Sequence, residues 1–254
     1  MSARRLVFVH GGVHTGSCWS ETVSVVCAVR PDTECMVVDL PGRRLVPGDL
    51  ASLTIEDCIS SVVEQITAQG TGPLMLVGHS LAGVIMGGVV RRLGAEKVQH
   101  VIFVACCVPK SGESVVDTLP FGLRQVVRHI VERSPVITSP RILVRYAFSN
   151  CATAEQRAQI RAQLVPESSA LVTQAFAADV PRAIRKSWVL TGCDRALPPA
   201  KQRGFIENLG GVDELVCIDA GHEVMITHPS ELARAIVQLA FSPPAKADEA
   251  TTAR

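Results

Sequence analysis

The residues of this sequence that are best suited to chemistry are a serine, an aspartate and a histidine that lie far apart along the chain. Ser80 stands in the stretch 78–83, whose sequence is Gly-His-Ser-Leu-Ala-Gly. A serine hydroxyl is a weak nucleophile, so it needs a base to take its proton and a third group to orient that base. The sequence therefore predicts nucleophilic catalysis by Ser80, with His222 as general base and then general acid, and with Asp194 orienting the histidine ring.

Ser80 is expected at a sharp turn from a strand into a helix. Residues 74–77 form an apolar run that is too short for a helix and is typical of a strand buried on both faces. From residue 81 to residue 93, apolar residues recur at three- and four-residue steps, as in a helix that packs one face. Gly78 and Ala82 keep the turn small where the helix crosses the strand. The pattern indicates a nucleophile elbow, and the alternative is a serine that only caps the helix.

Asp194 and His222 each follow a short apolar run that we predict to be a strand, at 187–190 and 215–218 respectively. The carboxyl ends of parallel strands meet at one edge of a sheet, and the order serine, acid, histidine is the one expected for this architecture. Asp219 is the alternative acid, because it lies closer to the histidine in sequence. Its place in a tight loop is more typical of a residue that forms a turn at a strand end.

Two backbone N–H groups are predicted to bind the oxyanion that forms when a carbonyl carbon is attacked. Leu81 directly follows the nucleophile and should give one of them, and Gly12 should give the other from the glycine-rich loop 10–16. The alternative interpretation of that loop is an ordinary flexible turn. His10 and His14 are expected to brace the loop by hydrogen bonds, since the catalytic scheme needs no second base.

Strands alternate with helices along most of the chain, which indicates a mostly parallel sheet covered by helices on both faces. Thr54 has Asp57 three residues on, and this pair predicts a capping box at the start of a helix. The predicted strands are 6–9, 35–38, 74–77, 101–104, 187–190 and 215–218, and the predicted helices are 19–29, 54–70, 81–93, 199–209 and 230–240.

The alternation of strands and helices is interrupted over residues 110–186, where no clear strand appears and prolines break short helical segments. We interpret this stretch, called the cap below, as a helical insertion over the strand ends. The predicted core is then 1–109 together with 187–241, and the polar stretch 242–254 is expected to be a frayed tail. The apolar side chains of the cap either line a substrate site or form the cap's own core.

The bulk properties of the chain exclude several classes of protein. With 254 residues, 47% of them hydrophobic, the chain can build one sizeable core. A net charge of +1 gives no electrostatic case for binding nucleic acid or an anionic membrane. Nine scattered cysteines fit neither a disulfide framework nor a zinc site, and they favour free thiols in the cytoplasm. We expect no metal or cofactor, a small-molecule ester as the partner, and leave a homodimer open.

Several segments together resemble the α/β-hydrolase superfamily, and within it the branch of plant methylesterases, hydroxynitrile lyases and bacterial pyrethroid-hydrolase-like esterases. The matching segments are 10–14 with Trp19, 39–42, 78–83, 194–198, and 221–225 with Pro229. They span nearly the whole predicted core, whereas the cap matches only in its placement. The resemblance implies an α/β-hydrolase fold, a triad of Ser80, Asp194 and His222, and oxyanion donors at Gly12 and Leu81.

Two positions bear on the type of reaction. Hydroxynitrile lyases of this branch carry a lysine directly after the catalytic histidine, where this chain has Glu223, and a threonine after the first loop histidine, where it has Gly11. Both differences favour ester hydrolysis over cyanohydrin cleavage. The resemblance thus implies a carboxylesterase-type serine hydrolase that acts through an acyl-enzyme, and the apolar side chains of the cap favour small to medium apolar esters as substrates. A lyase with the same triad and a non-catalytic, ligand-binding protein of this fold are the alternatives.

Overall fold

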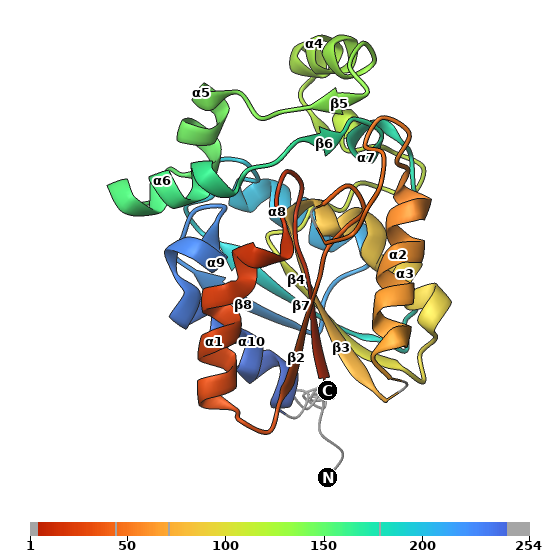
Figure 1. The fold of residues 1–254 in the computed structure, drawn as a ribbon, viewed down its shortest axis with the longest axis vertical. Helices are drawn as coiled ribbons and strands as arrows, with labels where there is room; N and C mark the ends of the chain where they lie inside the picture. The colour runs from red at the N-terminus through yellow and green to blue at the C-terminus, as the bar shows by residue number, and fades with distance from the viewer. Residues whose placement is uncertain (1–4, 44, 71, 178, 243–254) are drawn as a thin grey trace, which may run out of the picture.

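A central sheet of six parallel strands organises the protein. A computed structural model describes residues 5–43, 45–70, 72–177 and 179–242 (Figure 1). The strands of the sheet are β1 (Arg5–Val9), β2 (Glu34–Val38), β3 (Leu74–His79), β4 (Val98–Val104), β7 (Arg185–Thr191) and β8 (Glu214–Ile218). Their order is β2-β1-β3-β4-β7-β8, and every neighbouring pair is parallel. All carboxyl ends therefore share one edge, and the predicted parallel sheet is confirmed.

Helices cover both faces of the sheet, as Figure 1 shows. One face carries α1 (Ser20–Val29) and α10 (Pro229–Phe241), and the other carries α2 (Ile55–Ala68), α3 (Gly83–Leu93) and α8 (Pro199–Asn208). Successive side chains of a strand point to opposite faces. In β1, Leu6 and Phe8 accordingly belong to the core on the α1 side, and Val7 and Val9 to the core on the α2 side. Both layers are apolar, which explains why the strands read as continuous apolar runs.

The predicted ends of the helices are close to those observed. Thr54 and Asp57 form the predicted capping box at the start of α2. The helices predicted from residues 19 and 81 each begin with a 3-10 turn, η1 (Gly16–Trp19) and η2 (Ser80–Ala82), so α1 and α3 start slightly later. A short helix, α9 (Val224–Thr227), was not predicted. Within the described residues, none of the helices combines the length and apolar character that crossing a membrane requires.

Gly83 begins α3 where this helix passes directly over the backbone that follows β4. A Cβ atom at this position would collide with the carbonyl oxygen of Cys107, which is main chain and cannot turn aside. Gly204 lies in α8, and a Cβ atom there would meet no other group within 4 Å. The same substitution should therefore have opposite effects at these two glycines.

We expect Gly83→Ala to lower the free energy of unfolding by about 1–3 kcal/mol, the usual cost of overpacking. Gly204→Ala should raise the free energy of unfolding by about 0.5–1 kcal/mol, because alanine loses less backbone entropy in a helix. Urea unfolding followed by circular dichroism measures both values. A shift of the same sign in the two variants would contradict this account of the crossing at Gly83.

The cap lies between β4 and β7 and stands above the carboxyl edge of the sheet in Figure 1. Its elements are η3 (Val116–Thr118), α4 (Phe121–Val131), β5 (Val136–Ile137), α5 (Arg141–Leu143), a π-helical segment η4 (Val144–Phe148), α6 (Ala154–Gln163), β6 (Glu167–Ser168) and α7 (Ala170–Thr173). The prediction that no strand occurs here is wrong, because β5 and β6 pair antiparallel. Strands of two residues are too short to leave a periodic pattern.

Helix α4 exposes much of its apolar side. The exposed apolar residues of this helix are Phe121, Leu123, Val126 and Ile130. These side chains consequently do not form the cap's own core, which was one of the two interpretations of the apolar cap. The division of the chain into a core and a cap at 110 and 186 stays a prediction, and residues 243–254 of the predicted tail lie outside the described residues.

Candidate active site

Ser80 lies at the turn between β3 and α3, in a strained backbone conformation. Its φ of 51° is in the left-handed region, which a residue other than glycine rarely adopts. The Ser80 carbonyl accepts a hydrogen bond from the amide of Cys107 at 2.8 Å, which helps to hold the turn. A Cβ atom at Gly78 would lie 3.0 Å from the Met86 side chain and 3.2 Å from Cβ of Ala82. The turn therefore has no room for larger side chains at positions 78 and 82, as the sequence predicts.

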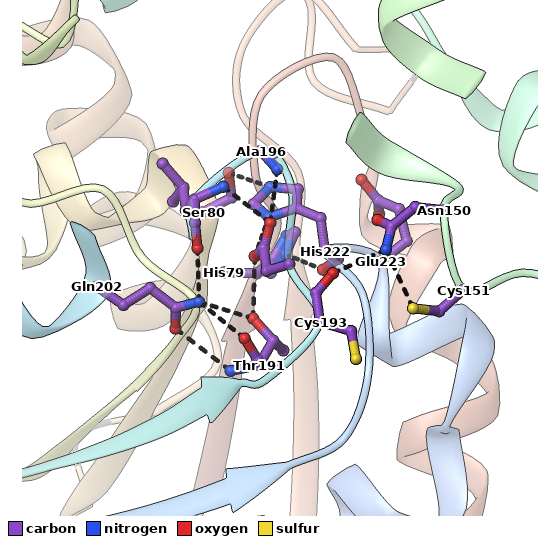
Figure 2. Close-up of polar contacts among 12 residues, drawn as sticks. His79, Ser80, Asn150, Cys151, Thr191, Cys193, Ala196, Gln202, His222 and Glu223 are labelled. Carbon is purple, nitrogen blue, oxygen red and sulfur yellow. Dashed lines mark hydrogen bonds and ion pairs between the residues drawn. The ribbon is translucent and has the colours of Figure 1, made fainter. Parts of the chain in front are cut away.

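The structure brings the three distant side chains together at the carboxyl edge of the sheet. Nε2 of His222 lies 2.8 Å from Oγ of Ser80, and Nδ1 of His222 lies 2.7 Å from Oδ2 of Asp194. Ser80 follows β3, Asp194 follows β7 and His222 follows β8. Figure 2 shows His222 beside Ser80, and the two contacts of its ring join hydroxyl, imidazole and carboxylate into one hydrogen-bonded chain.

The carboxylate of Asp194 is held by hydrogen bonds on both oxygens. Oδ1 accepts from the amides of Ala196 and Leu197, each at 2.8 Å. Oδ2 accepts from the hydroxyl of Thr191 at 2.9 Å as well as from His222. Burial alone would raise the pKa of Asp194, but His222 and these hydrogen bonds outweigh it and hold the pKa below its usual value. The group is thus a fixed, ionised acceptor.

Gln202 supports the loop that carries this aspartate. Its side-chain amide donates to Oγ1 of Thr191 at 2.9 Å and to the carbonyl of Leu197 at 2.8 Å. Its side-chain oxygen accepts from Nε1 of Trp188 at 3.2 Å. All of these groups are buried, and Figure 2 shows Gln202 beside Thr191. Gln202 therefore fixes both ends of the turn that contains Asp194.

His222 is buried, yet its environment favours its protonated form. Burial lowers the pKa of an imidazole, but Asp194 and then Glu223 more than offset this, so the pKa of His222 lies above its ordinary value of 6.5. Nδ1 faces a carboxylate and therefore carries the proton in the neutral ring, which leaves Nε2 as an acceptor toward Ser80. The ring is in the tautomer that can take a proton from the serine hydroxyl.

His79, which directly precedes Ser80, contacts the histidine loop. Nε2 of His79 lies 3.0 Å from the carbonyl oxygen of His222, and the two ring centroids are 4.8 Å apart. Burial, followed by the nearby His222, lowers the pKa of His79 to about 3. The neutral ring therefore donates its Nε2 proton to the His222 carbonyl, and it fixes the backbone of that loop.

Asp219, the alternative acid, binds a cysteine thiol. Its Oδ1 accepts a hydrogen bond from the thiol of Cys193 at 2.9 Å. The carboxylate beside this thiol, with some burial, raises the pKa of Cys193 to about 11. The geometry thus places Asp194, and not Asp219, against His222.

Two cap residues that sequence reasoning did not single out for the site also lie at it. The ring of Phe148 stacks on the ring of His222, with centroids 5.5 Å apart and planes 25° apart. The side-chain amide of Asn150 donates to the carbonyl of Cys193 at 2.7 Å, next to the aspartate (Figure 2). Neither residue belongs to a motif, so only the three-dimensional contact identifies it.

The glycine-rich loop after β1 is braced by His10. Burial, then the nearby Arg43, lowers the pKa of His10 to about 3. Nε2 of this neutral ring accepts from the amide of Leu40 at 3.1 Å, so Nδ1 carries the proton and donates to the carbonyl of Gly11 at 2.7 Å. In a trans peptide the N–H points opposite to the carbonyl. The amide of Gly12 is therefore directed away from His10.

The two predicted oxyanion donors, Gly12 and Leu81, lie side by side. A Cβ atom at Gly12 would be 2.9 Å from Cδ2 and 3.4 Å from Cβ of Leu81, so the two residues are in close contact. Within the described part of the chain, the amide of Gly12 makes no hydrogen bond. It is thus available to a ligand.

A buried contact between a histidine and a glutamate connects the glycine-rich loop to the histidine loop. Nε2 of His14 lies 2.9 Å from Oε2 of Glu223, and both side chains are almost fully buried. Burial would raise the pKa of Glu223, but His14 and then the other nearby histidines lower it to about 2. A negative charge therefore sits directly behind His222. Among the described residues, no histidine, cysteine, aspartate and glutamate side chains are grouped so that they could hold a metal ion.

Comparisons with known proteins agree with this architecture. A model of the α/β-hydrolase family matches residues 6–235. Norfluorocurarine synthase 2 of a Strychnos species is 24% identical to this chain, and the match covers 93% of this chain and 95% of the relative. A carbendazim hydrolyzing esterase of Nocardioides sp. (strain SG-4G) is 25% identical, with 92% and 98% covered.

Among solved structures, an extracellular α/β-hydrolase from a Paenibacillus species is similar to this protein with a TM-score of 0.81. Its sequence is 22% identical, and the match covers 93% of this chain and 98% of that chain. At this identity the likeness shows the fold alone. Because the family model matches most of the chain, the protein belongs to the α/β-hydrolase family.

Proposed function

We propose that this protein hydrolyses carboxylic esters of small to medium apolar substrates through an acyl-enzyme formed on Ser80. The proposal is carried by the hydrogen-bonded chain from Ser80 through His222 to Asp194. Ester hydrolysis in general agrees with membership of the α/β-hydrolase family, and one of the relatives is named as an esterase.

In the first half of the reaction, Oγ of Ser80 attacks the ester carbonyl carbon while Nε2 of His222 takes the hydroxyl proton. The carbonyl π electrons move onto the oxygen, which the amides of Gly12 and Leu81 bind. Asp194 stabilises the resulting imidazolium. The tetrahedral intermediate then collapses, the bond to the alcohol oxygen breaks, and His222 returns its proton to the leaving alkoxide. Ser80 is left acylated.

The second half repeats these steps with water. His222 takes a proton from a water molecule whose oxygen attacks the acyl carbon, and the same amides bind the oxyanion. Collapse breaks the bond to Oγ of Ser80, and the proton on His222 passes to that oxygen. The carboxylic acid leaves and the free enzyme is restored. The ring of Phe148, stacked on His222, offers an apolar surface for the substrate at the reacting centre.

The two positions that distinguish the lyases of the resembling branch support hydrolysis. A Cβ atom at Gly11 would lie 2.9 Å from both Nδ1 of His79 and Cβ of Ser80, so the threonine of those lyases has no room here. Their lysine is replaced by Glu223, whose carboxylate is buried against His14. A cationic group to stabilise a leaving cyanide is therefore lacking at this position.

Product analysis separates the two reactions. The purified chain is incubated with a series of p-nitrophenyl acyl esters and, in parallel, with aromatic and aliphatic cyanohydrins. We expect release of p-nitrophenol and carboxylic acid from short- and medium-chain esters, and no cyanide above the spontaneous rate. Cyanide release without ester hydrolysis would assign the lyase reaction, and turnover of neither class would favour a ligand-binding protein of this fold.

The ionisation of His222 should govern the pH dependence. Only the neutral ring can accept the serine proton, so kcat/KM should rise with pH through the pKa of His222. Because that pKa is raised, the midpoint should lie above 6.5. Glu223 is one cause of the raised pKa, so Glu223→Gln should move the midpoint to lower pH.

The control for the pH profile is Glu231→Gln, which removes an exposed carboxylate from α10. This variant should keep the wild-type midpoint. An unchanged midpoint in Glu223→Gln, measured on chains with wild-type melting temperatures, would contradict the electrostatic effect of Glu223 on His222.

A further inference from the structure

Val13, the residue after the predicted oxyanion donor Gly12, is held on both sides by the cap. Its amide donates to Oε2 of Glu167 at 3.0 Å, and its carbonyl accepts from the amide of Val165 at 2.8 Å. Val13 has a φ of 56°, a left-handed conformation that is strained for a β-branched residue. Such a conformation persists only where the surroundings impose it, and here the cap supplies the two hydrogen bonds that do so.

The carboxylate of Glu167 is buried and compensated. Its exposed fraction is 1%, and Nη2 of Arg43 lies 2.5 Å from its Oε2. Oε1 accepts from the amide of Ser168 at 3.0 Å. Arg43, itself buried, also donates to the carbonyl of His14 at 3.0 Å. The guanidinium thus neutralises a negative charge that would otherwise repel an oxyanion bound nearby.

These contacts fix both peptides that flank Gly12. His10 holds the carbonyl of the peptide before it, and Glu167 holds the amide of the peptide after it. Glycine has the widest backbone freedom of all residues, so its N–H keeps one direction only if its neighbours are anchored. One anchor, His10, comes from the core, whereas the other, Glu167, comes from the cap.

We infer that Glu167 is a positioning residue that aligns the oxyanion-binding amide of Gly12, so that the oxyanion hole is complete only when the cap is seated. This inference rests on the proposed ester hydrolysis and adds a cap residue to its machinery. If the cap moves away, Val13 loses both hydrogen bonds, and the amide of Gly12 is no longer held in one direction. The tetrahedral intermediate then loses a donor, although the ester can still bind.

The test compares a double variant with a matched control. Arg43→Met with Glu167→Leu replaces the buried pair by apolar side chains, a change that often preserves stability but removes the acceptor for Val13. Glu167→Gln keeps an acceptor and should retain most of the activity. Glu155→Gln changes an exposed cap carboxylate that does not contact the loop, and should have no effect. Each chain is assayed for kcat, KM, melting temperature and inhibition by an aryl trifluoromethyl ketone.

The ketone reports on the oxyanion hole directly, because Oγ of Ser80 adds to its carbonyl carbon as His222 takes the proton, and the new oxyanion occupies the hole. In the double variant we expect kcat to fall about 10- to 100-fold, the range for a displaced donor, with KM nearly unchanged. The inhibition constant of the ketone should rise by the same factor as kcat falls.

The outcomes separate the two proposals. A double variant that melts like the wild type and keeps both kcat and ketone affinity overturns the role of Glu167, while ester hydrolysis by the wild type still stands. A fall in kcat without weaker ketone binding also overturns that role, since it places the defect outside the oxyanion hole. A wild-type chain that hydrolyses no ester overturns the proposed function, and the inference with it.

Discussion

Ser80→Ala should lower kcat/KM for a p-nitrophenyl ester by about 10⁶-fold, the scale of loss when the nucleophile of such a triad is removed. The variant lacks the oxygen that lies 2.8 Å from Nε2 of His222, so no acyl-enzyme can form. The left-handed turn at residue 80 does not depend on the hydroxyl, so the variant should fold. Initial rates over a range of ester concentrations measure the loss.

Ser24→Ala is the matched control for this substitution. Ser24 is exposed on α1, and its loss should leave kcat/KM unchanged. A small residual rate in Ser80→Ala is expected, because the oxyanion donors and substrate binding still act. Activity within about tenfold of the wild type would contradict nucleophilic catalysis by Ser80, since a triad without its nucleophile loses far more.

Asp194→Asn is expected to lower kcat by about 10⁴-fold, because an amide can hold the wrong tautomer of the histidine and cannot stabilise its cation. Nδ1 of His222 now donates to Oδ2 of Asp194 at 2.7 Å. An asparagine that presents its NH₂ group to Nδ1 would put the proton on Nε2, where the serine needs an acceptor. The pH at which kcat/KM is half-maximal should also fall, since Asp194 raises the pKa of His222.

Asp219→Asn serves as the control for Asp194→Asn. Asp219 accepts a hydrogen bond from the thiol of Cys193 and lies on the same loop as His222. Asp219→Asn therefore disturbs that loop but leaves Asp194, the hydrogen-bond partner of His222, in place. We expect a modest effect on kcat. If Asp219→Asn were the more damaging of the two, the assignment of the acid would be wrong.

The parts of the site that follow local patterns could be predicted from the sequence. The apolar run of β3, the small residues around Ser80 and the helical spacing beyond it together predict a strand, a sharp turn and a helix, and all three are observed. Asp194 and His222 follow short apolar runs, and the carboxyl ends of parallel strands must share an edge. The meeting of the three side chains thus follows from sheet topology, not from any long-range pattern.

Contacts between distant loops could not be predicted in this way. The hydrogen bond from His79 to the His222 carbonyl joins residues 143 positions apart, and the ion pair of Arg43 with Glu167 joins residues 124 positions apart. No periodicity relates such positions, and one sequence carries no record of which loops meet. The cap was also the hardest part to predict, because its strands have two residues each and Phe148 lies in a π-helical segment.

The most direct measurement is the mass of the chain after reaction with a fluorophosphonate, followed by digestion to locate the modified residue. Such a reagent phosphonylates a serine whose hydroxyl is activated by a neighbouring base, with loss of fluoride. Our account predicts one adduct per chain, on the peptide that contains Ser80, and none in Ser80→Ala. A folded wild-type chain that stays unmodified, or carries the adduct on another residue, would contradict it.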